Sequence, residues 1–323
     1  MAFGPDILKI DVVKETEQVV AFLREQVKTV YRRNGIVVGL SGGIDSAVMA
    51  ELSVRAMGKD AVAGLVLPEK ESNPVSSFYA KAHAEKMGIA YREVDITATV
   101  ESVMAYARRD EYIRTLVPEY APDCRYNISL PTDLLERDSF NFYILQVQLS
   151  DGTIRKKRLG FDAFRAITSF ANIKIRSRML HLYHEAESLG YVVAGTTNRT
   201  EYLLGDFCKY GDGGTDMEAL AHLYKNQIYQ LADYLGVIPE IINRSPSPDT
   251  FSLPVTDQEF FFRIPFDRLD HLLYAWEHRI GIPETAAALG LGDDAVKRAF
   301  TDFTTKNRTT AHLRVMPFSM ESK

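Results

Sequence analysis

The sequence predicts an α/β fold, in which a Rossmann-like parallel sheet carries helices on both faces. Short apolar runs of strand length alternate along the chain with longer segments whose apolar residues recur at helical spacing. The connections between them are short, and several of the helical segments end in glycine. Strand–helix repetition of this kind is typical of a parallel sheet whose two faces are both covered by helices.

The first third of the chain follows this alternation most closely. Gly58 and Gly88 each close a helical pattern, and a short strand pattern follows each of them. The expected elements, in chain order, are a helix over 12–33, a strand over 35–40, a helix over 46–58, a strand over 61–68, a helix over 76–88 and a strand over 90–96. Ligands bind at the carboxyl ends of the strands in such folds, so the turn after the first strand is a candidate site.

The rhythm breaks near Pro122. The run FNFYILQVQL alternates its side chains, SDG is a turn signal, and TIRKKRLG alternates again. We therefore expect a β-hairpin insertion within residues 120–160 of a single α/β domain that spans residues 1–323. The parallel pattern then resumes with a helix over 172–190, a strand over 191–196, a helix over 225–236, the proline-rich segment 245–254 and a helical tail that ends at 317.

Composition narrows the classes of function. The chain has 323 residues, a net charge of −5 and a pI near 5.9, so no positive excess favours nucleic acid. No apolar run approaches the roughly 20 residues that a membrane-spanning helix requires. The amino terminus is acidic where a signal peptide is basic, and Cys124 and Cys208 are too few for a disulfide framework. We expect a soluble cytoplasmic protein with no nucleic-acid or membrane partner.

The turn after the first strand is the strongest candidate site. It reads GLSGGIDS and consists of Gly39, Leu40, Ser41, Gly42, Gly43, Ile44, Asp45 and Ser46. Gly42 and Gly43 let the backbone approach an anion closely, and the first N–H groups of the following helix favour phosphate. Asp45 would repel a phosphate unless a cation lies between them, which indicates Mg²⁺ bridging this carboxylate and a polyphosphate. The alternative is an ordinary strand–helix turn with Ser46 as a helix cap.

The string SGGxDS after a strand resembles the pyrophosphate loop of the ATP pyrophosphatase group, whose members adenylate a carboxylate or carbonyl. Within that group, four further motifs resemble those of the ammonia-dependent NAD synthetase family. They are GTxNxxE at 195–201, KYGDGGTD at 209–216, LYKxQ at 223–227 and PSxD at 246–249. The resemblance implies that ATP and deamido-NAD form an acyl adenylate with release of pyrophosphate, and that ammonia then displaces AMP.

The resemblance also implies roles for particular residues. Asp45 and Glu201 match ligands of a magnesium ion, and Asp212 matches an aspartate near the ammonia site that would accept a proton. Lys225 would neutralise charge as pyrophosphate leaves, so Asp45, Asp212 and Lys225 form the expected catalytic set. Besides Gly39–Ser46 and Lys225, the residues that match ATP contacts are Thr196 and Ser247. Those that match substrate contacts are Arg176, Lys209, Asp216, His312 and Leu313.

Charged residues on helices are mostly solvated, which gives each assignment a structural alternative. Glu201 would then be a solvated carboxylate and Lys225 a surface charge. Arg176 would belong to an exposed basic face together with Lys174 and Arg178. The joint placement of these residues in several matched motifs favours the functional interpretation.

Four departures from the family pattern concern the substrate. Val66 replaces an arginine of the family's second loop, and Leu313 replaces a lysine that would face the dinucleotide. The segment QEFFFR at 258–263 replaces DExxLG, and Phe266 stands where a tyrosine is usual. The hairpin adds the basic run 155–158, which is either a solvated face or a source of the missing cations.

These departures leave two enzyme hypotheses: an NAD synthetase with a rearranged dinucleotide site, or a related ligase that amidates a sugar acid or a specialised metabolite. A third hypothesis is a non-catalytic nucleotide-binding regulator, against which the joint presence of the metal and phosphate residues argues. The chain has no room for a glutamine-hydrolysing domain of usual size, so we expect free ammonia or ammonia from a separate glutaminase. The resemblance implies a homodimer.

Overall fold

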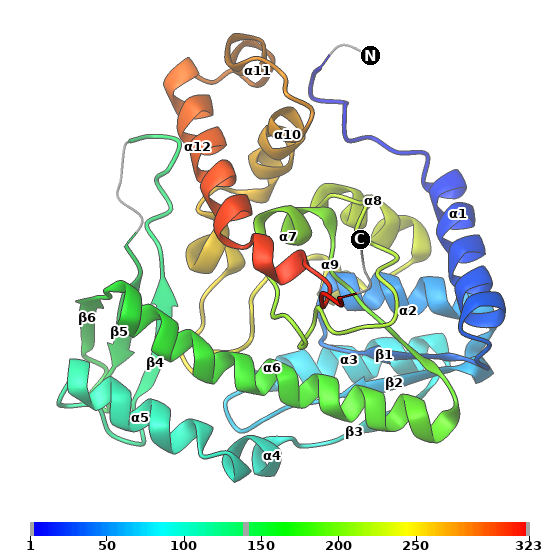
Figure 1. The fold of residues 1–323 in the computed structure, drawn as a ribbon, viewed down its shortest axis with the longest axis horizontal. Coiled ribbons are helices and arrows are strands. Elements are labelled where there is room, and N and C mark those ends of the chain that lie inside the picture. The colour runs from blue at the N-terminus through cyan, green and yellow to red at the C-terminus, as the bar shows by residue number, and fades with distance from the viewer. Residues whose placement is uncertain (1–2, 138–141, 321–323) are drawn as a thin grey trace.

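The computed structural model describes residues 3–137 and 142–320 and is built around a four-stranded parallel sheet. The strands follow the order β3-β2-β1-β7, so β1 lies inside the sheet and the chain returns to its other side to form β7 (Figure 1). Every neighbouring pair is parallel, as the alternation in the sequence predicts. The strands are β1 (Ile36–Gly39), β2 (Val62–Val66), β3 (Ala90–Glu93) and β7 (Val192–Ala194).

The helices begin and end at local signals. Asp11 caps the first helix by accepting a hydrogen bond from Lys14 N at 3.1 Å, and Gly88, Gly190 and Gly236 end three others in the left-handed conformation. The helices are α1 (Val12–Glu25), α2 (Ile44–Met57), α3 (Pro74–Met87), α4 (Thr97–Ser102), α5 (Ala105–Leu116), α6 (Phe161–Leu189), α7 (Arg199–Leu204), α8 (Lys225–Leu235), α9 (Pro239–Ile242), α10 (Phe266–Glu277), α11 (Ile282–Leu289) and α12 (Asp293–Thr309). Shorter helical turns cover Gln26–Val30, Lys59–Ala61, Gln258–Phe262 and Ala311–Arg314.

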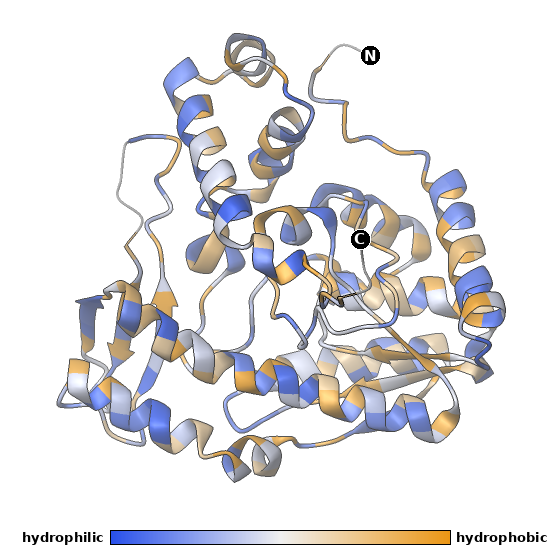
Figure 2. Ribbon diagram, viewed as in Figure 1, coloured by the Kyte–Doolittle hydropathy of each residue, from blue (hydrophilic) through white to orange (hydrophobic). Residues whose placement is uncertain are grey.

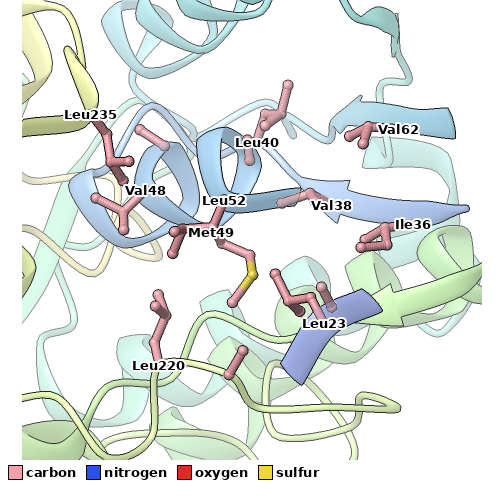
Figure 3. Close-up of a cluster of buried hydrophobic side chains, with 14 of the residues drawn as sticks. Leu23, Ile36, Val38, Leu40, Val48, Met49, Leu52, Val62, Leu220 and Leu235 are labelled. Carbon is pink, nitrogen blue, oxygen red and sulfur yellow. The ribbon is translucent and has the colours of Figure 1, made fainter. Parts of the chain in front are cut away.

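Alternate residues of the strands face two different helical layers. Val38 and Val62 join Leu23 of α1 and Leu52 of α2 in one buried apolar cluster (Figure 3). Val37 lies in a second cluster, formed with side chains of α4, α5 and α6. Successive side chains of a strand point to opposite faces, so these two clusters lie on opposite sides of the sheet. The prediction that helices cover both faces is confirmed.

The predicted hairpin is present as β5 (Ile144–Gln148) and β6 (Ile154–Arg158), which pair antiparallel. A third strand, β4 (Arg125–Ser129), pairs with the other edge of β5 and was not expected from the sequence. All five residues of β6 are exposed, and four of them, 155–158, are basic, so most of the strand is hydrophilic (Figure 2). The expected run began at 140, and residues 138–141 lie outside the described residues. That 120–160 is an insertion in a single domain stays a prediction.

The helix α6 is longer than the predicted 172–190, because it begins directly after β6 with Gly160 at its amino-terminal cap. No proline or glycine interrupts the chain from there to its end. Its first half packs on the antiparallel sheet through Ile167 and Ala171, and its second half packs on the parallel sheet through Ala186. This one helix therefore connects the two sheets (Figure 1).

The carboxyl-terminal helices α10, α11 and α12 form a third layer with its own apolar cluster. Leu203 and Leu204 of α7 belong to that cluster, so the layer holds α7 in place beside the parallel sheet. Among the described residues, we find no helix with both the length and the apolar composition that crossing a bilayer requires.

Candidate active site

The GLSGGIDS turn connects β1 to α2 at the carboxyl edge of the parallel sheet. Its backbone is tightly confined at Gly42, which has a φ of +71°. A Cβ atom there would lie 2.2 Å from the carbonyl oxygen of Ser76 in α3. Only glycine combines this torsion with so close an approach. The turn is therefore seated directly against the first turn of α3.

The two serines of the turn bond to each other and to its backbone. Ser41 Oγ and Ser46 Oγ are 3.0 Å apart, and Ser46 Oγ donates to Gly43 O at 2.9 Å. The alternative in which Ser46 caps the helix is wrong, because Gly43 occupies the cap position and no side chain caps it. An uncapped amino end of a helix presents N–H groups and the positive end of its dipole, which favours an anionic ligand.

Asp45, in the first turn of α2, faces Lys225 at the start of α8. Lys225 Nζ lies 2.5 Å from Asp45 Oδ2 and 3.6 Å from Glu201 Oε1. Asn198 Nδ2 donates to Asp45 Oδ1 at 2.9 Å. Asn198 also caps α7, since its side chain accepts from Glu201 N while Glu201 Oε2 accepts from Asn198 N. The ends of three helices thus bring one ammonium and two carboxyl groups together; we name Asp45, Glu201 and Lys225 the open cluster.

The charges of the open cluster shape one another. Lys225 is 3% exposed, and burial alone would lower its pKa, but Asp45 and Glu201 together hold the pKa of Lys225 well above its usual range. Burial, followed by the nearby Asp45, raises the pKa of Glu201 well above its usual range. Two carboxyl groups share one ammonium here, so a second cation beside them would favour their ionised forms.

The donors of the open cluster suit a hard divalent cation that also binds substrate oxygens. Asp45 and Glu201 both present carboxylate oxygens to the same space. Mg²⁺ is commonly held by one or two carboxylates together with phosphate oxygens and waters. Within residues 3–137 and 142–320, no group of three or more His, Cys, Asp or Glu side chains is placed to hold a metal. A magnesium ion held by these two carboxylates would complete its coordination with phosphate oxygens or waters.

The other predicted ATP contacts lie on two segments that border the turn. Thr196 is half-buried and follows β7, whose Ala194 pairs with Val38 beside the turn. Ser247 is exposed in the loop after α9. Arg244 in that loop donates to Ser76 Oγ at 2.8 Å and reaches Gly42 O at 3.5 Å, which holds the loop against the turn.

Three of the predicted substrate residues meet at the loop 209–216. Arg176 of α6 donates through Nε and Nη2 to Lys209 O at 3.3 and 3.2 Å. Lys209 Nζ in turn donates to His312 O at 3.1 Å. Leu313 follows His312 in a short helical turn and is half-buried. The loop therefore joins α6 to the carboxyl-terminal segment.

Asp212 lies in the same loop and is exposed. Its Oδ1 accepts a hydrogen bond from Cys208 N at 2.6 Å, which fixes the orientation of the carboxylate. Cys208 itself is 3% exposed, and burial raises the pKa of its thiol to about 11. A thiol with a raised pKa is a poor nucleophile, so Cys208 acts as a small packing residue.

Asp216 contacts a different set of residues from the other predicted substrate contacts. Its Oδ2 accepts from Val193 N at 2.7 Å, and its Oδ1 accepts from Tyr183 OH at 3.2 Å. Its carbonyl oxygen accepts a hydrogen bond from Tyr31 OH. A cavity of about 350 Å³ opens beside it, lined by Tyr31, Arg33, Tyr183, Ala186, Glu187, Tyr191 and Val192.

Two residues of this region are not singled out by the sequence analysis. Asn198 lies inside the GTxNxxE motif, so the motif itself carries its signal. Glu218 accepts hydrogen bonds from Thr197 N at 3.2 Å and Thr215 Oγ1 at 2.9 Å, and burial raises the pKa of Glu218 to about 7. A Cβ atom on Gly195 would lie 2.3 Å from it. No pattern around Glu218 points to these contacts.

The structure also locates the departures from the family pattern. Val66, which stands where the family has an arginine, is 2% exposed and lies in the apolar core. Another arginine contacts the adjacent loop: Arg178 of α6 donates to Leu67 O at 3.1 Å and to Ser72 Oγ at 3.3 Å. The basic run 155–158 lies on β6, at the end of α6 that is far from the parallel sheet (Figure 1). Within one chain it therefore supplies no cation to the turn.

Comparisons with known proteins identify the family to which this chain is similar. A family model described as NAD synthase matches residues 15–122 and 142–317. The NH(3)-dependent NAD(+) synthetase of Rhizobium meliloti (strain 1021) is 40% identical over 317 residues, which are 98% of this chain and 94% of that protein. The protein of the same name from Thermotoga neapolitana is 36% identical over 81% of this chain and 83% of that protein.

Solved structures share the fold. The NH3-dependent NAD synthetase from Campylobacter jejuni, in complex with the nitrate ion, matches with a TM-score of 0.63 at 23% identity. The NMN synthetase from Francisella tularensis matches with a TM-score of 0.65 at 20% identity. Each match covers 97% of this chain and 100% of the other.

Proposed function

The chain belongs to the NAD synthase family, and on that premise we propose that it is an ammonia-dependent NAD synthetase. A carboxylate oxygen of deamido-NAD attacks the α-phosphorus of ATP, the bond from that phosphorus to the bridging oxygen breaks, and pyrophosphate leaves. Ammonia then attacks the acyl carbon of the adenylate, AMP leaves, and the nitrogen loses a proton to give NAD. The names of relatives at up to 41% identity support deamido-NAD over the other carboxylates considered above.

The GLSGGIDS turn is the proposed phosphate site. The uncapped amino end of α2 and the close backbone approach at Gly42 support this assignment. Lys225 stabilises the charge that develops on pyrophosphate as it leaves, because its raised pKa keeps it cationic and the surrounding helices hold it in position. Thr196 and Ser247 border the turn on two sides and are assigned as further contacts to ATP.

Asp45 and Glu201 are the proposed magnesium ligands. The charge balance of the open cluster supports this assignment, since two carboxyl groups share a single ammonium there. When bound, the ion neutralises the polyphosphate charge that would otherwise repel Asp45. Asn198 holds Asp45 and caps α7 at Glu201, so it fixes the distance between the two carboxylates.

We place the dinucleotide along the loop 209–216. Arg176, Lys209 and His312 converge there, and the cavity beside Asp216 lies at the end of the same loop. Leu313 contributes apolar surface and no charge. Asp212 accepts the proton from the attacking nitrogen, and its hydrogen bond with Cys208 N supports a fixed orientation for that transfer.

One observation carries the proposal. Asp45 of α2, Glu201 of α7 and Lys225 of α8 lie together in a chain that is 40% identical to an NH(3)-dependent NAD(+) synthetase. The test measures pyrophosphate and NAD from purified protein with ATP, Mg²⁺ and ammonium, with and without deamido-NAD. We expect pyrophosphate release to depend on deamido-NAD, with one NAD formed per pyrophosphate. Release that responds to a sugar acid and not to deamido-NAD would overturn the assignment.

We also propose that the protein is a cytoplasmic homodimer that uses free ammonia or ammonia from a separate glutaminase. Apolar side chains near the end of α1 and after it support a partner surface, since Phe22 and Val30 are 40% and 59% exposed. Light scattering during gel filtration tests the oligomeric state. A monomer mass at micromolar concentration would contradict the dimer.

A further inference from the structure

A buried lysine with no part in the proposed chemistry lies at the centre of a second ion-pair cluster. Lys174, in the middle of α6, is 2% exposed. Its Nζ contacts Glu69 Oε1 at 2.9 Å, Glu71 Oε2 at 2.6 Å and Thr250 O at 3.0 Å. An ammonium group has three donors, so each N–H of Lys174 has a partner. We name Lys174, Glu69 and Glu71 the closed cluster.

The carboxylates of the closed cluster are held from the other side by α5. Tyr106 OH donates to Glu69 Oε2 at 2.6 Å, and Arg109 Nη1 donates to Glu71 Oε2 at 2.7 Å. Burial alone would raise the pKa of Glu69, but Lys174 and Tyr106 together hold it below its usual range. Lys174 and Glu69 are therefore buried and charged, and the three donors of Lys174 and both oxygens of Glu69 have hydrogen-bond partners, which restricts them to one geometry.

The partners of Lys174 come from two loops that border the GLSGGIDS turn. Glu69 and Glu71 lie in the loop 67–73, between β2 and α3. Thr250 lies in the first part of the loop between α9 and Gln258–Phe262; we refer to this part, which carries Ser247, as the loop 243–250. Lys174 thus connects two loops that are far apart in the sequence to one point on α6.

Further hydrogen bonds join the same two loops to each other. Asn73 N donates to Asp249 Oδ1 at 3.0 Å, across the two loops. Arg178, one turn after Lys174 on α6, holds the loop 67–73 through Leu67 O and Ser72 Oγ. The loop 67–73 is therefore fixed from inside the protein, directly after Val66, which replaces the family's arginine.

We propose that Lys174 is a positioning residue for ATP: by fixing the loop 67–73 to the loop 243–250, it holds Ser247 in place beside the GLSGGIDS turn. This inference rests on the proposed function, because it requires ATP to bind at that turn. Stability alone does not explain the buried charges, because apolar side chains of similar volume would pack α6 at least as stably. The charges therefore serve to position the loops. Only directed contacts to both loops fix the spacing between them.

The test separates positioning from folding with two variants. Lys174→Met leaves Glu69 buried without its cation, so we expect a lower Tm. Lys174→Met combined with Glu69→Gln removes that unpaired charge and leaves Glu71 paired with Arg109. The double variant is expected to recover most of the Tm, while the connection through Lys174 stays broken and only the hydrogen bond from Asn73 N to Asp249 Oδ1 still joins the two loops.

The readouts are the ATP Kd from calorimetry and the KM values for ATP and deamido-NAD. The matched control is Arg298→Met on α12, which removes hydrogen bonds to Leu134 O and Leu135 O in another loop. We expect the double variant to bind ATP about tenfold more weakly, as when one well-formed hydrogen bond is lost. The KM for deamido-NAD is expected to change by less than about twofold, and the control to change neither constant.

Each outcome decides one point. Wild-type ATP affinity in the double variant, with Tm recovered, would overturn the positioning role and leave Lys174 a folding residue. Partial recovery of ATP affinity in Lys174→Arg, which keeps the charge, would support the role. If wild-type protein binds ATP but forms no NAD from deamido-NAD, the proposed function fails, while the ATP Kd of the variants still tests this inference.

Discussion

Lys225 and Lys174 are both buried and both face two carboxyl groups, yet the regions around them differ. The two glutamates that pair with Lys174 are 0% and 12% exposed, and its contacts to them are 2.9 Å and 2.6 Å. The partners of Lys225 are more accessible: Asp45 is 16% exposed and Glu201 21%, and the second contact is 3.6 Å long. The carboxylates of the open cluster are therefore more accessible to another ligand than those of the closed cluster.

The comparison teaches that burial of a charge does not by itself mark a chemical role. A lysine whose three donors are all satisfied by protein atoms has no donor left for a substrate. A lysine with one short and one long contact can move toward a phosphate as the charge on that phosphate grows. Changes to the open cluster should therefore alter turnover, and changes to the closed cluster should alter stability and nucleotide affinity.

The largest expected effect is that of Asp45→Asn. The amide keeps the shape of the side chain but loses the charge that we assign to magnesium, so turnover should fall by about 10³-fold or more. The fold should stay intact with a lower Tm, because the buried Lys225 loses its shortest ion pair. Rates are measured at increasing Mg²⁺, and full turnover at saturating Mg²⁺ would remove Asp45 from the metal site.

Next in size is Lys225→Met in the open cluster. Loss of a preorganised cation should lower kcat by about 10²–10³-fold, with a smaller effect on the KM for deamido-NAD. Lys174→Met serves as the comparison, because it removes an equally buried lysine from the closed cluster. If both variants lose kcat to the same extent, the distinction between the two clusters is wrong.

A smaller effect is expected at Glu218, a carboxyl group that belongs to neither the open cluster nor the closed cluster. It is half-buried and accepts hydrogen bonds, and burial raises its pKa from 4.5 to about 7. The folded protein then holds this proton more tightly than the unfolded chain, so stability falls as the pH rises from about 4.5 to about 7. We predict that Glu218→Gln loses less Tm than the wild type between about pH 5 and about pH 8. Parallel curves of Tm against pH would contradict the raised pKa.

The smallest expected effect is that of Ser247→Ala. The hydroxyl is exposed and accepts a hydrogen bond from Asp249 N at 3.4 Å. Loss of a single neutral hydrogen bond to ATP should raise its KM about two- to fivefold and leave the Tm unchanged. An unchanged KM would place Ser247 outside the nucleotide site.

The parallel sheet and the GLSGGIDS turn are predictable from sequence because they depend on local rules. Strand and helix periods, and the need for glycine at a crowded position with positive φ, act within a few residues. The early start of α6 was not predicted. The strand β4 was not predicted either, because it is stabilised by pairing with β5 and by contacts from residues 252–254. Pairing between distant segments leaves no local signal.

The same limit applies to the charged residues. Lys174 was assigned to an exposed basic face in one alternative, which is wrong because it is buried. Its carboxylate partners lie 105 and 103 residues away in the chain, so no spacing rule connects them. The resemblance to a family grouped Asp45, Glu201 and Lys225. Physical reasoning on the sequence alone does not predict that these three side chains are close in space.

The strand β6 has a consequence for how copies of the molecule meet one another. It forms one edge of its sheet, all its residues are exposed, and no strand among the described residues pairs with its outer side. A bare edge is a template on which another chain can add a strand, and aggregates grow in this way. Arg155, Lys156, Lys157 and Arg158 would face like charges in such a pairing. This edge thus favours colloidal stability, most strongly at low ionic strength.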